Sequence, residues 1–225
     1  MLRFLFTSLH QRYSKRTKWH ISRFGQCSMP NTLYIPSLMV ENNVLDLCVN
    51  KFSDIHAVSA FVRQHSGGVF VRHRCATDLN AIQDSSVDYI FADPPFGQNI
   101  YYADCSLLWE GWLQQYTDES KEIVVSERRN GGLFKNLGDY ERLMQDAFAQ
   151  MFRVLKPDRW ATIEFNNSDG AVFYAITSAV KTVGFEIVNM LLLDKNQKSF
   201  KQIQGQRVKP MLWIRMFCLT CVSLL

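Results

Sequence analysis

Four consecutive residues, Asp93-Pro94-Pro95-Phe96, combine an acid, two rigid rings and an aromatic side chain at one point in the sequence. They follow residues 87–92, a short apolar run rich in β-branched and aromatic side chains that predicts a strand. Proline cannot continue the hydrogen-bond ladder of a strand, so the strand must end there and a stiff loop must begin. Open α/β sheets bind ligands outside the carboxyl ends of their strands, which is where this loop would lie.

The chemistry that fits such a loop is methylation of the exocyclic amine of a planar base. This amine is a poor nucleophile because its lone pair is delocalised into the ring. The Asp93 carboxylate and the Pro94 carbonyl would accept its two protons and localise that lone pair, while the flat Phe96 ring would stack the base. A bare Asp-Pro-Pro would favour a purely structural turn, and the aromatic residue after it favours the functional interpretation.

Elements that alternate between strand and helix must position this loop. Apolar spacing predicts helices over residues 40–65, 104–116, 139–155 and 169–183, and strands over residues 69–71, 87–92, 161–165 and 185–193. This alternation predicts an α/β fold with a parallel, Rossmann-like sheet.

At these residues the sequence resembles the S-adenosylmethionine-dependent amino-methyltransferases that act on adenine or cytosine in DNA, whose catalytic motif is Asp-Pro-Pro followed by Phe, Tyr or Trp. Three further stretches, residues 107–113, 151–157 and 199–202, resemble one subgroup, the large prokaryotic DNA methylases. The resemblance implies that Asp93 and Pro94 polarise the amine, Pro95 holds the loop and Phe96 stacks the extruded base. It also implies S-adenosylmethionine as cofactor and DNA as partner.

The chain departs from this pattern at the cofactor side. The subgroup carries a glycine-rich loop, Asp-Pro-Phe-Ala-Gly-Ser-Gly, after its first strand, whereas this sequence contains no Gly-x-Gly and nothing that resembles the first two strands. We therefore expect an incomplete Rossmann-like methyltransferase fold, with an upstream chain as the partner that would carry the cofactor-binding half.

Three segments are expected: a basic segment at residues 1–39, the catalytic part at residues 40–206 and a divergent apolar tail at residues 207–225. Two interpretations of the tail stay open. It is either an unrelated sequence of the kind that a frameshift produces, or a variant strand over residues 211–219 that completes the sheet.

Four residues outside the loop are candidates for binding. In the family, an acid at the position of Asp78 contacts the adenine of the cofactor, although a turn or cap aspartate is a close alternative. Asn166 follows an expected strand and could line the substrate pocket, or it could be a turn asparagine. Arg128 and Arg129, in the long connection over residues 117–138, could meet DNA phosphates, against the ordinary alternative of a solvated polar loop.

The positive charge of the chain is concentrated at its amino-terminal end. Residues 1–40 hold six of the 25 Lys and Arg residues and none of the 21 Asp and Glu residues. A basic segment with interleaved aromatic rings can follow a nucleic-acid backbone. A transit peptide and the packed edge of a larger domain are the alternatives, and the resemblance favours the packed edge with DNA contact added.

The cysteine pattern predicts neither a disulfide framework nor a metal site. The single Cys-x-x-Cys pair, Cys218 and Cys221, supplies half of a zinc site, and reduced thiols in a cytoplasmic protein are expected. The apolar stretch at residues 211–225 is interrupted by Arg215 and is shorter than the ~20 residues that span a bilayer.

Two other functions remain open at this point. One is an RNA methyltransferase that acts on the exocyclic amine of guanine, since some of these enzymes carry Asp-Pro-Pro-Phe. The other is an inactive methylase remnant that only binds nucleic acid. The sequence does not distinguish adenine from cytosine as the target base.

Overall fold

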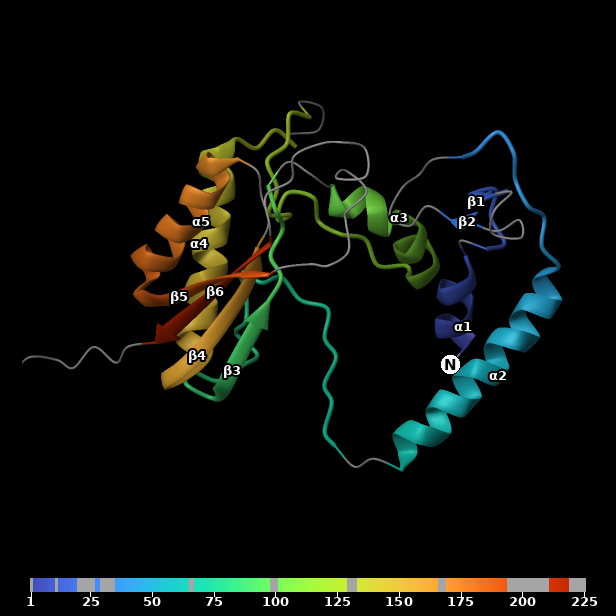
Figure 1. The fold of residues 1–225 in the computed structure, drawn as a ribbon, viewed down its shortest axis with the longest axis horizontal. Helices are drawn as coiled ribbons and strands as arrows, with labels where there is room; N and C mark the ends of the chain where they lie inside the picture. The colour runs from blue at the N-terminus through green and yellow to red at the C-terminus, as the bar shows by residue number, and fades with distance from the viewer. Residues whose placement is uncertain are drawn as a thin grey trace, which may run out of the picture. The chain divides into compact units, whose positions relative to one another are not determined.

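The structure is a computed structural model that describes residues 2–10, 12–19, 27–28, 35–64, 67–97, 101–128, 133–165, 169–193 and 211–218. It divides into two compact units (Figure 1). The helical unit comprises Met1–Arg72 and Tyr101–Glu122, and the sheet unit comprises His73–Ile100 and Ile123–Leu225.

The helical unit contains α1 (Leu2–Leu9), α2 (Val44–Arg63) and α3 (Tyr102–Leu113), with two short antiparallel strands, β1 (Thr17–Lys18) and β2 (Cys27–Ser28). Asn43 begins α2, because its side chain accepts hydrogen bonds from the amides of Leu45 and Asp46. The buried core of this unit is small and consists of Leu5, Leu9 and Ile55.

The sheet unit holds four strands in the order β3-β4-β6-β5. They are β3 (Val87–Ala92), β4 (Leu155–Phe165), β5 (Phe185–Leu193) and β6 (Met211–Cys218). β3 and β4 are parallel, and β6 runs antiparallel to both of its neighbours, β4 and β5. β3, β4 and β5 therefore point the same way, and the sheet is partial, as expected for an incomplete Rossmann-like fold. The predicted α/β class is confirmed.

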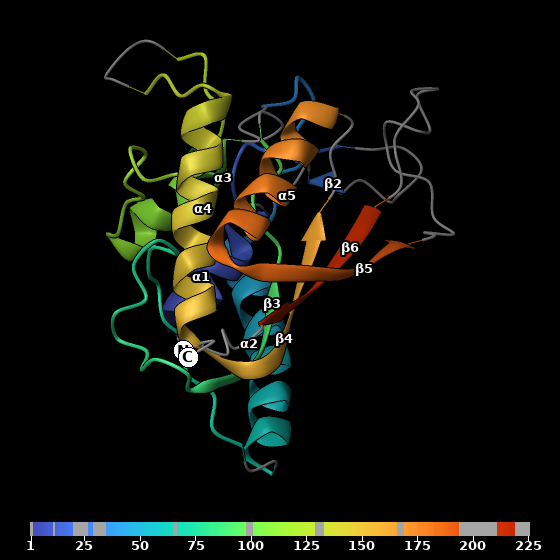
Figure 2. The ribbon, with the colours of Figure 1, turned by 90° about the vertical axis from the view of Figure 1, so that its left-hand side faces the viewer.

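Two helices, α4 (Leu137–Val154) and α5 (Gly170–Val183), lie side by side on one face of this sheet (Figures 1 and 2). The apolar positions of α4 recur every three to four residues, so one stripe of the helix faces the core. That stripe holds six buried residues: Tyr140, Leu143, Met144, Ala147, Phe148 and Val154. All of these except Val154 pack with Ala161, Ile163 and Phe165 of β4 and with the buried face of α5.

The strand expected over residues 69–71 is not present. These residues have no regular secondary structure, and Val69, Phe70 and Val71 are 82%, 88% and 90% exposed. The backbone amides and carbonyls of a strand need hydrogen-bond partners on a neighbouring strand. None of the described strands pairs with residues 69–71.

The carboxyl-terminal segment contributes β6, the strand that one interpretation of the tail expected. Its backbone pairs with β4 from Trp160↔Phe217 to Phe165↔Leu212, and with β5 on its other side. The boundaries expected at residues 39 and 206 stay predictions. Within the part of the chain that the structure describes, no helix is long and apolar enough to cross a membrane.

Candidate active site

The Asp93–Phe96 loop leaves the sheet at the carboxyl end of β3. The last paired residue of β3 is Ala92, opposite Ile163 of β4, so the loop begins directly after the ladder ends. Asp93 is exposed, Pro94 is buried, and Pro95 and Phe96 are partly buried. The loop therefore presents its carboxylate to solvent while its rings lie against the protein.

Two buried aromatic residues hold the loop from different elements. The Tyr140 hydroxyl, in the first turns of α4, donates a hydrogen bond of 2.6 Å to the Pro95 carbonyl. The Phe96 ring packs edge to face on Phe165, the last residue of β4, with centroids 5.4 Å apart and planes at 87°. Tyr140 is 0% exposed and Phe165 1%, so both contacts join the loop to the rigid core.

The two expected acceptors of the loop are not used by other described residues. Among these residues, none donates a hydrogen bond to the Asp93 carboxylate or to the Pro94 carbonyl. The next residue, Gly97, is buried with φ at +90°, a conformation that glycine adopts without steric cost. The chain can thus turn away immediately after Phe96.

Tyr140 lies on the apolar stripe of α4, and this spacing alone does not indicate its contact with the loop. A signal was present, because a buried tyrosine hydroxyl must find a hydrogen-bond partner. The start of α4 fixes where this hydroxyl lies. The Asn136 side chain accepts from the Asp139 amide at 2.9 Å, and the Asp139 carboxylate accepts from the Asn136 amide at 3.0 Å, which forms a capping box.

Asp78 lies at the other end of α4. Its carboxylate accepts a hydrogen bond from the Asn80 amide, and the neighbouring Leu79 bonds to Gln150 and Arg153 in the last turns of α4. Tyr140 and Gln150 are ten positions apart, which is about 15 Å along a helix axis. The structure therefore does not bring Asp78 and the Asp93 loop together.

Of the two arginines, Arg128 is described and Arg129 lies outside the described residues. Arg128 is partly buried, and its backbone amide donates to the Ser126 hydroxyl at 3.3 Å. Ser126 also pairs through its backbone with Lys135, so Arg128 belongs to the connection that leads into α4. Asn166 follows Phe165 directly and also lies outside the described residues.

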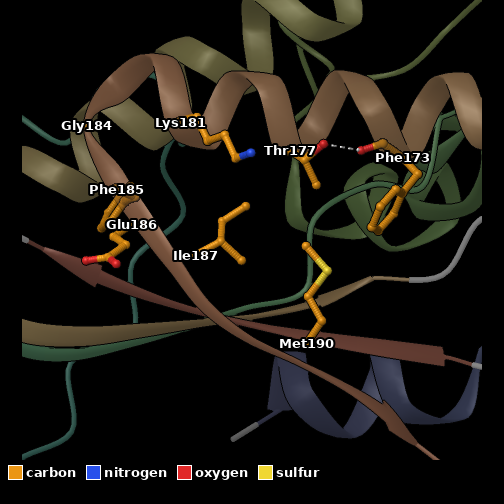
Figure 3. Close-up of a pocket in the computed structure, with 8 residues that line it drawn as sticks. All are labelled: Phe173, Thr177, Lys181, Gly184, Phe185, Glu186, Ile187 and Met190. Carbon is orange, nitrogen blue, oxygen red and sulfur yellow. Dashed lines mark hydrogen bonds between the residues drawn. The ribbon is translucent and has the colours of Figure 1, made fainter.

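A cavity of about 600 Å³ lies elsewhere in the sheet unit, between α5 and β5 (Figure 3). Its walls include Phe173, Thr177 and Lys181 of α5 and Ile187 and Met190 of β5. The Thr177 hydroxyl donates a hydrogen bond to the Phe173 carbonyl, so its hydrogen already has an acceptor within α5 (Figure 3). β3 and β5 are the two edges of the sheet, and none of the predicted site residues lines this cavity. No cluster of possible metal ligands occurs within the described ranges.

Several solved structures are similar to this chain. A Thermus thermophilus protein described as a DNA modification methylase, solved with S-adenosyl-L-methionine, is 14% identical over 65% of this chain and 54% of its own, with a TM-score of 0.39. The cytosine-N4-specific PvuII DNA methyltransferase is 14% identical over 62% of this chain and 45% of its own, also with a TM-score of 0.39. A SAM-dependent methyltransferase of Methanosarcina mazei is 12% identical over 76% of this chain and 77% of its own, with a TM-score of 0.37.

The chain spans about half the length of the first two of these structures. No family model matches the sequence, and no curated protein matches it. Structural similarity as low as this assigns neither an activity nor a substrate to this chain. The α/β class of the chain is shown by its own sheet. The cofactor expected from the sequence is the one bound in the Thermus thermophilus complex.

The described residues include the features expected for binding a base, but fewer of those expected for binding the cofactor. The Asp93 loop has two acceptors to which none of the described residues donates, and an aromatic ring, at the end of a strand. The cofactor side lacks any Gly-x-Gly, and its one candidate, Asp78, lies in a turn near the opposite end of α4.

Proposed function

We propose that this chain is the substrate-binding and catalytic part of an S-adenosylmethionine-dependent DNA methyltransferase that modifies the exocyclic amine of adenine or cytosine. The observation that carries the proposal is the Asp93–Phe96 loop. It stands at the carboxyl end of β3 with an exposed carboxylate, its Pro95 carbonyl is held by Tyr140, and its Phe96 ring packs on Phe165.

The residues of the loop have separate roles in this reaction. The Asp93 carboxylate and the Pro94 carbonyl each accept a hydrogen bond from one N–H of the target amine, which directs its lone pair away from the aromatic ring. As the amine gains its methyl group it becomes positively charged, and the carboxylate stabilises that charge until a proton leaves. The Phe96 ring stacks the extruded base and fixes its plane.

S-adenosylmethionine, when bound, supplies the electrophilic methyl group. We propose that an upstream chain carries the glycine-rich loop. As a partner of this chain, it would hold most of this cofactor. The contact between Asp78 and the cofactor stays a prediction, and the Asp78→Ala variant tests it in a calorimetric titration of S-adenosylmethionine. Titrations with and without a short DNA duplex would show whether the chain alone binds the cofactor.

Replacement of Asp93 by Ala tests the proposed chemistry. Loss of one aligned charge-stabilising group costs about 10²–10³-fold in kcat, and the exposed position of Asp93 means that the fold should be unaffected. Asp88→Asn is the matched control, because Asp88 is an exposed acid of β3, the strand that precedes the loop, and it pairs with Lys156 at 2.8 Å. Methyl transfer from labelled cofactor to DNA should disappear in the first variant and persist in the second.

The same assay, run with DNA and ribosomal RNA side by side, separates the main alternative. Methyl transfer to RNA and not to DNA would identify RNA as the substrate. The proposed role of the loop would be unchanged. Full transfer by the Asp93→Ala variant would contradict the proposed catalytic role itself.

A further inference from the structure

We propose that Tyr140 is a positioning residue that sets the orientation of the Asp93–Phe96 loop from the first turns of α4. The inference rests on the proposed function for its effect on catalysis, but its structural part stands by itself. It starts from the 2.6 Å hydrogen bond between the fully buried Tyr140 hydroxyl and the Pro95 carbonyl, which joins residues 45 positions apart.

The loop has very few backbone torsions that can change. The proline rings fix φ of Pro94 and Pro95 near −65°. Each proline also restricts ψ of the residue before it, so ψ of Asp93 and ψ of Pro94 are confined to extended values. Between the Asp93 and Phe96 α-carbons, ψ of Pro95 is the remaining soft torsion.

The Tyr140 bond acts on that torsion. The carbonyl oxygen of Pro95 lies in the plane of the peptide that joins Pro95 to Phe96. A donor that holds this oxygen therefore holds the whole peptide plane and, with it, ψ of Pro95. The position of the Phe96 α-carbon relative to that of Asp93 is thus set by a hydroxyl on another element.

Phe165 provides the second point of attachment. Once the peptide plane is fixed, the edge-to-face contact between Phe96 and Phe165 limits the direction of the Phe96 side chain. The capping box of Asn136 and Asp139 fixes the first turn of α4 and hence the place of the Tyr140 ring. A base that stacks on Phe96 would then meet Asp93 and Pro94 in one preset arrangement.

Tyr140→Phe is the direct test, because it keeps the buried ring and removes only the hydroxyl. Tyr89→Phe is the matched control. It also removes one tyrosine hydrogen bond, from the Tyr89 hydroxyl to the Thr162 hydroxyl at 2.7 Å, within the same unit but away from the loop. Asn136→Ala is a second variant, which leaves Tyr140 intact and releases the helix end that carries it.

Hydrogen exchange of the Phe96 and Gly97 amides is the readout that needs no activity. Pro94 and Pro95 have no amide hydrogen, so these are the first amides after Asp93 that can exchange. We expect exchange to be at least several-fold faster in Tyr140→Phe and Asn136→Ala than in the wild type and Tyr89→Phe. The midpoint of thermal unfolding should be similar in Tyr140→Phe and Tyr89→Phe.

Turnover supplies the second readout. Misplacement of reacting groups by about 1 Å can cost about 10²-fold in rate, so kcat of Tyr140→Phe should fall about tenfold or more. KM for S-adenosylmethionine should not change, whereas a general loss of structure would change it.

Unchanged exchange at Phe96 and Gly97 would overturn the positioning role, whatever the activity. Faster exchange with unchanged kcat would overturn its catalytic consequence. If the wild-type protein transfers no methyl group to any nucleic acid, the proposed function fails, and the exchange comparison still decides whether Tyr140 positions the loop.

Discussion

At the residue scale, the Asp93 loop separates a solvent-facing charge from buried rings. Asp93 keeps its hydration because it is exposed, so ending an apolar strand with a carboxylate carries little desolvation cost. Pro94 is buried and Phe96 partly so, which ties the same short loop to the core. The exposed charge and the anchoring contacts thus belong to different residues of the same four-residue loop.

Phe96→Ala should weaken binding of DNA that presents an extruded base. Stacking of one base on an aromatic ring contributes about 1–3 kcal/mol, so affinity should fall about 5- to 150-fold. Duplexes with 2-aminopurine at the target position report this stacking through their fluorescence. Phe96→Tyr keeps the ring and should bind like the wild type. Equal affinity of the Ala variant would show that the base does not stack at Phe96.

At the element scale, the ends of helices decide where functional side chains lie. Asn136 caps α4 and thereby sets the register that places Tyr140 against Pro95.

In the helical unit, His10 follows α1 directly and packs on Trp109 of α3, with ring centroids 4.0 Å apart. The Nδ1 atom of His10 lies 2.8 Å from the Thr7 carbonyl, an acceptor, so Nδ1 carries the proton.

The helical unit should lose stability as the pH falls below about 6.5. Burial lowers the pKa of His10 below its ordinary value of 6.5, and nearby Arg16 lowers it further, although the bond to Thr7 opposes both effects. The unfolded chain then binds more protons than the folded one, so stability declines from pH 6.5 down to the folded pKa and levels off below it.

Urea unfolding at several pH values, followed through tryptophan fluorescence, measures this slope. His10→Phe keeps a ring against Trp109 and should remove the slope between the two pKa values. His56→Gln, which changes an exposed histidine of α2, should retain it. A slope that survives in His10→Phe would assign the pH dependence to another group.

At the scale of the whole molecule, both units have exposed apolar side chains among their described residues. Val69, Phe70 and Val71 are almost fully exposed, and Tyr89 and Phe91 of β3 are about half exposed at 52% and 53%. Parallel strands are usually covered on both faces, whereas α4 and α5 cover one face of this sheet. This surface is consistent with the proposal that a further chain completes the fold.

Phe70→Ser should reduce self-association without lowering the midpoint of thermal unfolding. An exposed apolar run with β-forming residues and unpaired backbone groups favours contact between molecules. Light scattering over a range of protein concentrations measures the change, and Phe70→Leu, which stays apolar, should behave like the wild type. A large drop in the unfolding midpoint of Phe70→Ser would mean that Phe70 packs against the protein in solution.

Local patterns in the sequence were sufficient to predict much of the sheet unit. The strand over residues 87–92, the helix over residues 169–183 and the strand over residues 185–193 depend on side-chain periodicity and on short-range stop signals such as Gly184, whose φ is +108°. The order of residues in the Asp93 loop also follows from local chemistry, because two prolines and a following aromatic ring restrict the backbone whatever surrounds them.

Contacts between distant residues were decided only by the tertiary structure. The backbone pairing of β6 between β4 and β5 and the bond from Tyr140 to Pro95 both join segments that lie far apart in the sequence. The strand expected at residues 69–71 failed for the same reason, since a strand forms only where a neighbour accepts its hydrogen bonds. Sequence periodicity specifies which side of an element is apolar, but the element that covers it is selected by packing.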